Sequence, residues 1–233
     1  MYLRTGFWTL AVFCSVLVVP ANAASLTLRT GVDGSNAVLA DLTSDPSWTI
    51  STDGGSTFVA AKTPSMSIWA TCACNLELVG AGAKWISDPT TNGIESSDAW
   101  TIGNTVFANR TFSLTGFDLS AVSLSGSWRV ADRRLGIYIN GNLIDSATAD
   151  NEIAFLEDQT FALAGGSGFF VAGVNTLQLR GSSVNAHFDG FWLDATITDN
   201  LSGVPEPSSF LLLGTGFACV ALRRYRRGFL PRS

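Results

Sequence analysis

The chain is poor in the residues from which most active sites are built. It has one histidine and four cysteines in 233 residues, and only 14% of its residues are charged. The single histidine, His187, has Asp189 nearby, but a Ser-His-Asp triad also needs a nucleophile held on a defined turn. Gly166-Ser167-Gly168 lies in a glycine-rich loop instead. Nothing selects a pair of acids for glycoside hydrolysis, so we expect no catalytic residues.

Cysteine is also too scarce for a disulfide framework. Cys14 and Cys219 lie in apolar segments near the two ends, so only Cys72 and Cys74 belong to the central part. On a regular strand, residues i and i+2 have Cα atoms roughly 6.5–7 Å apart, at the edge of disulfide geometry. A Cys72–Cys74 bridge requires a tight turn, and two reduced thiols are the alternative. A zinc site needs four ligands, and nothing nearby completes the set.

The N-terminal segment has the three parts of a secretory signal peptide. Arg4 supplies a positive charge, Phe7 to Val19 is an apolar run, and Ala21-Asn22-Ala23 is a small-x-small cleavage site. An apolar run of this length with these flanks is typical of a signal peptide rather than a transmembrane helix. We therefore predict that residues 1–23 are removed after Ala23.

The C-terminal segment combines three elements in a fixed order. An extended Pro-Glu-Pro element comes first, because proline fixes φ and removes backbone donors. An apolar stretch over 210–222 follows, shorter than the roughly 20 residues of a comfortable membrane-spanning helix. Arginines then oppose translocation and indicate a cytoplasmic tip. The residues are Val204, Pro205, Glu206 and Pro207 for the first element, and Arg223, Arg224, Arg226 and Arg227 for the last.

This arrangement resembles the PEP-CTERM sorting signal of Gram-negative bacteria that make exopolysaccharide. The resemblance implies a temporary anchor in the inner membrane, which an exosortase-type enzyme recognises and cuts. It predicts a sorting signal over residues 204–233 with a single transmembrane segment at 210–222. An ordinary permanent anchor is the alternative, but that alternative leaves the Pro-Glu-Pro element unexplained.

The remaining body, residues 24–203, is acidic and long enough for one domain with a sizeable core. Of 14 basic and 19 acidic residues, six arginines and one glutamate belong to the end segments, so the body keeps eight basic and 18 acidic residues and a net charge of −10. An acidic body argues against nucleic acid and anionic lipid as partners.

Short apolar runs with period-two alternation recur along the body, separated by Gly, Asn, Asp and Ser. Such runs predict an all-β, antiparallel sandwich or jelly roll. Asn140-Gly141 between two apolar runs predicts a hairpin with a type I′ turn. The expected strands are Ser25–Arg29, Trp48–Ser51, Thr57–Ala61, Ala83–Ile86, Thr105–Leu114, Ala121–Val130, Gly136–Ile139, Asn142–Ile144, Thr160–Leu163, Asn175–Arg180 and Gly190–Ile197.

A second resemblance covers roughly residues 83–198. The segments Ile137-Tyr138-Ile139-Asn140-Gly141 and Gly173-Val174-Asn175-Thr176-Leu177 follow Ala131-Asp132, and this order is similar to galactose-binding-like β-sandwich modules. The turn after Asp132 departs from the pattern, because Arg133-Arg134 replaces a second acidic or Asn residue. The resemblance implies sugar binding and a structural Ca²⁺, for which Asp33, Asp118, Asp132 and Asp194 are candidate oxygen ligands. None of these lies in a loop with EF-hand spacing.

Tryptophan is the residue type that can test sugar binding, because aromatic faces stack on sugar rings. Trp85, Trp128 and Trp192 have apolar neighbours in strand patterns, which predicts core positions. Trp69 and Trp100 lie near expected loops and are the candidate glycan contacts.

The sequence therefore predicts an exported, non-enzymatic surface or matrix protein that associates with glycan in an extracellular polysaccharide layer. Its expected partners are an exosortase-type enzyme, extracellular polysaccharide and, transiently, the inner membrane. A purely structural or adhesive protein without a specific ligand is the first alternative, and a secreted hydrolase is the second.

Overall fold

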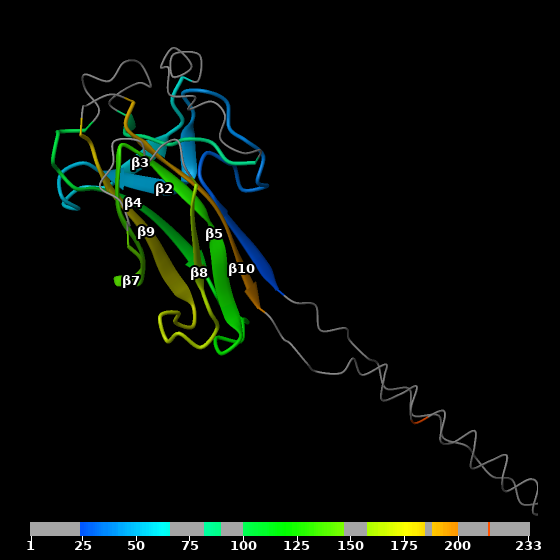
Figure 1. Cartoon of the computed structure of the whole chain (residues 1–233). Coiled ribbons are helices and arrows are strands. Elements are labelled where there is room, and N and C mark those ends of the chain that lie inside the picture. Colours follow the sequence, from blue (N-terminus) through cyan, green and yellow to red (C-terminus); the bar gives the residue numbers. More distant parts are fainter. Residues whose placement is uncertain are drawn as a thin grey trace, which may run out of the picture. The chain divides into compact units, whose positions relative to one another are not determined.

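The computed structural model describes residues 24–65, 82–89, 100–146, 158–184 and 188–199, together with Gly214. The chain divides into two compact units. One unit comprises Ala23–Leu201, and the other comprises Met1–Asn22 with Ser202–Ser233. The account below concerns the first unit, which holds all the described strands (Figure 1).

Ten strands form two sheets in which every named pair is antiparallel. The four-stranded sheet has the order β1-β10-β5-β8, and the six-stranded sheet has the order β3-β2-β4-β9-β6-β7. The prediction of an all-β antiparallel sandwich is confirmed. The strands are β1 (Ser25–Arg29), β2 (Ser44–Ser51), β3 (Val59–Lys62), β4 (Val106–Ser113), β5 (Val122–Ala131), β6 (Arg133–Ile139), β7 (Asn142–Asp145), β8 (Gln159–Leu163), β9 (Val174–Ser182) and β10 (Gly190–Asp199).

Alternate residues of each strand enter one hydrophobic core between the sheets. On β9, for example, Leu177 and Leu179 are fully buried while Gln178 between them is partly exposed. Successive side chains on a strand point to opposite faces, so one face of each sheet faces the core. The predicted core positions of Trp85, Trp128 and Trp192 are confirmed, since these side chains are 0–3% exposed.

The β6–β7 hairpin turns at Asn140-Gly141, as the sequence predicts. Both residues have positive φ, 49° and 82°, which a type I′ turn requires. The Asn140 amide also ties the turn to the next motif: its nitrogen donates to Asn175 Oδ1 at 2.8 Å, and its oxygen accepts from Thr176 N at 2.9 Å. Asn175 is fully buried. The two segments quoted for the galactose-binding-like resemblance therefore meet through their asparagines.

One expected strand is wrong. Residues 83–86 form no ladder: Ile86 makes an isolated bridge to Phe191, and the next residue, Ser87, makes one to Lys62. Apolar side chains there are buried, Trp85 and Ile86 completely, so the apolar pattern reflects burial without regular pairing. Short apolar runs cannot separate these two cases.

The two ends of this unit lie at the same end of the sandwich. Strand β1 pairs with β10 so that Ser25 is opposite Thr198. The Asp199 amide then donates to the Ala24 carbonyl at 2.9 Å. The first and last described residues of the body are therefore neighbours.

Candidate functional site

Several residues singled out in the sequence lie outside the described residues. These are the sorting element, the terminal arginines, Trp69, Cys72, Cys74 and His187. The residues of the expected signal peptide also lie outside, as does the apolar stretch 210–222 apart from Gly214. Within the described part of the chain, no helix has the length and apolar character needed to cross a membrane.

Trp100 is not a sugar-facing residue, so this prediction is wrong. Its side chain is 2% exposed, and its ring centroid lies 5.0 Å from that of Phe191 on β10. Its backbone amide donates to Asp189 Oδ2 at 3.3 Å. The polar run before Trp100 indicated a loop position, but the indole itself is packed in the core. An indole this deeply buried cannot stack on a sugar ring.

The four candidate calcium ligands have separate roles. Hydrogen bonds from Ser35 and Ala37 lower the pKa of Asp33, and hydrogen bonds from Ser120 lower that of Asp118, so both carboxylates stabilise their own turns. Asp194 forms an ion pair with Arg29 at 2.8 Å. Asp132 is buried beside Asp189. Across the described ranges, no group of three or more His, Cys, Asp or Glu residues is arranged to hold a metal ion.

Asp132 and Asp189 form a buried acid pair at one end of the sandwich. Ala131 at the end of β5 pairs with Gly190 at the start of β10. Asp132 follows Ala131 and Asp189 precedes Gly190, so this pairing brings the two aspartates near each other. Each aspartate is 1% exposed. Burial first, and then the nearby negative charge of Asp132, raise the pKa of Asp189 to about 7, against the lowering effect of the Ser183 hydroxyl and the Trp100 amide. The Asp189 carboxyl group therefore changes its protonation state near neutral pH.

The acid pair also has unmatched polar atoms. Asp189 Oδ1 and the Trp100 indole nitrogen are buried and have no hydrogen-bond partner among the described residues. A buried polar group without a hydrogen-bond partner lowers the stability of the folded state. We therefore expect these two atoms to destabilise this end of the sandwich. The sequence showed Asp189 only as a neighbour of His187, and strand pairing was needed to place it beside Asp132.

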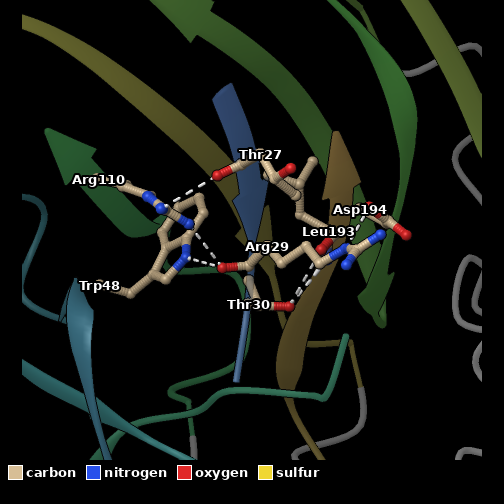
Figure 2. Close-up of polar contacts among 7 residues, drawn as sticks. All are labelled: Thr27, Arg29, Thr30, Trp48, Arg110, Leu193 and Asp194. Atoms are coloured by element: carbon tan, nitrogen blue, oxygen red, sulfur yellow. Dashed lines mark hydrogen bonds and ion pairs between the residues drawn. The ribbon is translucent and has the colours of Figure 1, made fainter. Parts of the chain in front are cut away.

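A second polar network lies at the β1 edge of the four-stranded sheet (Figure 2). Arg110 on β4 donates to the carbonyls of Arg29 and Thr27 at 2.9 and 3.3 Å, and the Trp48 indole donates to Arg29 O at 2.7 Å. Arg29 in turn pairs with Asp194. The contacts join the edge strand of the four-stranded sheet to β2 and β4 of the six-stranded sheet.

Burial and charge oppose each other at Arg110. Burial lowers its pKa, and the negative charge of Asp45 raises it again. Asp45 is 1% exposed, and burial raises its pKa against hydrogen bonds from Ser47, Gly31 and Trp48. A partly buried cation and a buried anion thus lie near each other at this edge, and each charge partly offsets the unfavourable burial of the other.

The outer face of the six-stranded sheet carries two rows of side chains that cross the strands. In the first row, Thr49, Asn109, Gln178 and Tyr138 are successive register partners on β2, β4, β9 and β6. In the second row, Phe107 on β4 is opposite Arg180 on β9, which is opposite Gly136 on β6. We call these residues the outer-face rows. Apart from Gly136, the outer-face rows consist of polar or aromatic residues, and they include one cation, Arg180.

Arg180 is held between two aromatic rings. Its guanidinium carbon lies 3.6 Å from the Tyr138 ring centroid and 5.3 Å from that of Phe107. Its Nε donates to Gln178 Oε1 at 2.6 Å, and the Gln178 amide donates to Asn109 Oδ1 at 2.9 Å. In the described chain no hydrogen bond or ion pair is found for its two terminal nitrogens. These nitrogens keep their donors available.

A hollow adjoins the rows at Phe107. Its volume is about 430 Å³, and it is lined by Asp53, Gly54, Asn104, Thr105 and Phe107. Hydrogen bonds from Ser51 and Thr57 lower the pKa of Asp53 to about 2, so the carboxylate is ionised at neutral pH. The hollow therefore combines an aromatic wall with hydroxyl, amide and carboxylate groups.

Sequence reasoning missed the outer-face rows. Phe107 and Asn109 alternate with buried residues on β4, and Gln178 and Arg180 do the same on β9. This alternation was visible, but it identifies a solvent-facing side without showing which strands are neighbours. The order β4-β9-β6 brings the residues together, and this order is set by long-range pairing.

Comparisons with known proteins match one segment directly. Residues 203–227 match the family model described as the PEP-CTERM protein-sorting motif. No curated protein matches the chain.

Solved structures show two distant likenesses. An FMN-binding beta-glucuronidase from Facaelibacterium prausnitzii L2-6 is 14% identical with a TM-score of 0.37, and the match covers 76% of this chain and 23% of that one. The GH31 alpha-xylosidase from Xanthomonas citri is 9% identical with a TM-score of 0.29, covering 78% of this chain and 18% of that one. The chain thus spans less than a quarter of either protein.

The order of the Pro-Glu-Pro element, apolar stretch and arginines in the sequence agrees with the family match. Residues 203–227 of this chain are a PEP-CTERM protein-sorting motif, which marks it as an exported surface protein processed by an exosortase.

Proposed function

We propose that this protein is a non-enzymatic component of an extracellular polysaccharide layer, delivered there by its sorting motif and retained by contact with glycan. The observation that carries the proposal is the sorting motif at residues 203–227, attached to a separate all-β unit. A compact sandwich with its own core is suited to persist after the motif has been removed.

Two further observations support the non-enzymatic part of the proposal. The carboxyl groups with the most unusual environment, those of Asp132 and Asp189, are each 1% exposed. A general acid must come within hydrogen-bond distance of its substrate, and these positions give a polysaccharide no access. The accessible polar and aromatic groups lie instead on a sheet face, where they can bind a ligand without a reacting centre.

Export and processing are tested with the full-length chain in a host that has an exosortase. The intact mass of the protein recovered outside the cell should correspond to loss of both end segments. A Pro205→Ala, Pro207→Ala double variant should remain in the membrane fraction, because the extended element is lost. A recovered protein that still ends at Ser233 would contradict the proposal.

Retention is tested on the processed protein from the same cultures. It should sediment with the host's purified exopolysaccharide and be released when the polysaccharide is enzymatically depolymerised. If it stays in the supernatant at every polysaccharide concentration, the alternative of a structural surface protein without a specific ligand replaces this one.

A further inference from the structure

We propose that the outer-face rows are a binding site for an acidic polysaccharide, with Arg180 taking the carboxylate of a uronate ring. The inference rests on the proposed function, because it names the surface and the glycan class through which retention would occur. The occupant is argued from three features of the face: an uncompensated cation, its fixed orientation, and the chemistry of the groups around it.

Among the described residues, the cation at position 180 has no acidic partner, in contrast to three other cations. Arg29, Lys84 and Arg129 pair with Asp194, Asp41 and Asp158. Within the described ranges, Arg180 contacts only rings and an amide. In a body of net charge −10, a partly buried arginine without a carboxylate partner is a local positive charge that is complementary to a carboxylate supplied from outside.

The guanidinium is also preorganised. Tyr138 and Phe107 hold it by their ring faces, and Gln178 fixes its Nε. Gly136 makes room for this arrangement, because a Cβ there would lie 3.2 Å from Tyr138 Cε2 and 2.9 Å from Leu143 Cδ1. The terminal nitrogens are thus presented together, and a planar fork of this kind binds a carboxylate through two parallel hydrogen bonds at little entropic cost.

The surrounding groups fit a sugar chain better than a peptide or a lipid headgroup. Thr49, Asn109 and Gln178 offer hydroxyl and amide groups in one row, and register places Tyr138 at the end of that row. Three strand spacings give a row of roughly 14 Å, which several linked sugar rings can follow. The hollow beside Phe107 adds Asp53, Asn104 and Thr105, whose polar atoms can bind the hydroxyls of a neighbouring ring.

The experiment compares polysaccharides that differ only in the carboxylate. Processed protein is titrated with polygalacturonate and with the same polymer after chemical reduction of its carboxyl groups. We expect binding to polygalacturonate that weakens with added salt, and binding at least tenfold weaker to the reduced polymer. Equal affinity for both polymers overturns the assignment to acidic glycans.

Substitutions locate the site. Arg180→Gln should weaken binding to polygalacturonate by about tenfold or more, since a charged hydrogen-bonded pair is lost, and Arg180→Lys should recover only part of it. Arg129→Gln is the matched control, because Arg129 also lies over an aromatic ring, that of Trp192 at 5.9 Å, but on the other sheet. Binding that is lost equally with Arg129→Gln, or not lost with Arg180→Gln, overturns the proposal.

A further variant tests the site even if the Arg180 variants fail to fold. Thr49 is exposed and belongs to the same rows, so Thr49→Glu adds a negative charge to the face without disturbing the core. It should weaken binding to polygalacturonate at unchanged thermal midpoint, and unchanged affinity counts against the site.

The proposed function can survive the failure of this inference. If wild type and Arg180→Gln are retained equally on the host's exopolysaccharide, retention stands and this site is wrong. If wild type is not retained there at all, both are wrong. If Arg180→Gln changes only the sedimentation of the free protein, the face is a contact between two copies and the glycan site is overturned.

Discussion

The β1 edge and the Asp132–Asp189 end both bury charged side chains, but they compensate them differently. At the edge, Arg110 lies near Asp45, and its donors reach the carbonyls of Arg29 and Thr27. At the Asp132–Asp189 end, two aspartates lie near each other, and Asp189 Oδ1 accepts no hydrogen bond from the described residues. Compensated charge holds two sheets together, whereas uncompensated charge makes the fold sensitive to pH. Three of the four predictions that follow test this contrast, and the other gives a reference outside both regions.

The largest effect is expected at the compensated edge. Arg110→Met should lower the free energy of unfolding by about 3 kcal/mol, because the carbonyls of Arg29 and Thr27 lose a charged donor and the buried Asp45 loses the positive charge near it. The measurement is urea unfolding at pH 7. Arg129→Met is the control, since its partner Asp158 is 50% exposed and such surface pairs contribute under about 1 kcal/mol. Equal losses of unfolding free energy in the two variants would show that the contacts of Arg110 contribute no more to stability than an exposed ion pair.

At the acid pair, we expect a substitution to raise the free energy of unfolding rather than to lower it. The folded protein holds the Asp189 proton more tightly than the unfolded chain, with a pKa of about 7 against an ordinary 3.8. Stability contributed by that proton is present at low pH and is lost as pH rises toward about 7. Asp189→Asn should therefore stabilise the protein by about 2 kcal/mol at pH 8 and have little effect at pH 4. Parallel stability profiles for the two proteins between pH 4 and 8 would refute the assignment.

A substitution outside both regions gives a reference for backbone strain. Gly141 has φ of 82° and no heavy atom within 4 Å of an added Cβ, so Gly141→Val tests conformation alone. A β-branched residue is poorly tolerated at positive φ, and we expect a loss of about 1.5 kcal/mol. The thermal midpoint measures it. Gly34→Val is the control, because Gly34 also has open space but no positive φ.

The smallest effect compares two buried indoles. The Trp48 nitrogen donates to Arg29 O at 2.7 Å, whereas the Trp100 nitrogen has no partner in the described structure. Their exposures are 1% and 2%, so replacement by phenylalanine removes similar ring area at both sites. Trp48→Phe should cost about 1 kcal/mol more than Trp100→Phe, the net value of one hydrogen bond. Equal costs in chemical denaturation would show that the hydrogen bond at the edge contributes nothing.

The strands were predictable because period-two alternation is a local property. The Asn140-Gly141 turn was predictable for the same reason, since positive φ at both positions favours these two residues. Sheet order is not local, and the residues of the outer-face rows come from four strands. Their proximity could not be read from spacing. The sorting motif could be recognised because its three parts are contiguous in sequence.

Trp100 shows the limit of arguing exposure from neighbours. A polar run precedes it, yet its ring packs on Phe191 of β10. The contact joins residues 91 positions apart, and only the path of the chain places them together. Asp189 was overlooked for the same reason, because its raised pKa depends on Asp132, which β5–β10 pairing brings near.

The pairing of β1 with β10 determines how the body can be displayed. Because Ala24 and Asp199 are neighbours, the chain enters and leaves the sandwich at one pole. Val204 lies five residues after Asp199 in the sequence, and five residues reach at most roughly 18 Å. An enzyme that cuts the sorting motif must therefore act within a few residues of the folded body. Gly190, where β10 begins, lies roughly 30 Å from Asp199 along the strand, so it is the end of this strand that lies farther from the sorting motif along the chain's exit path.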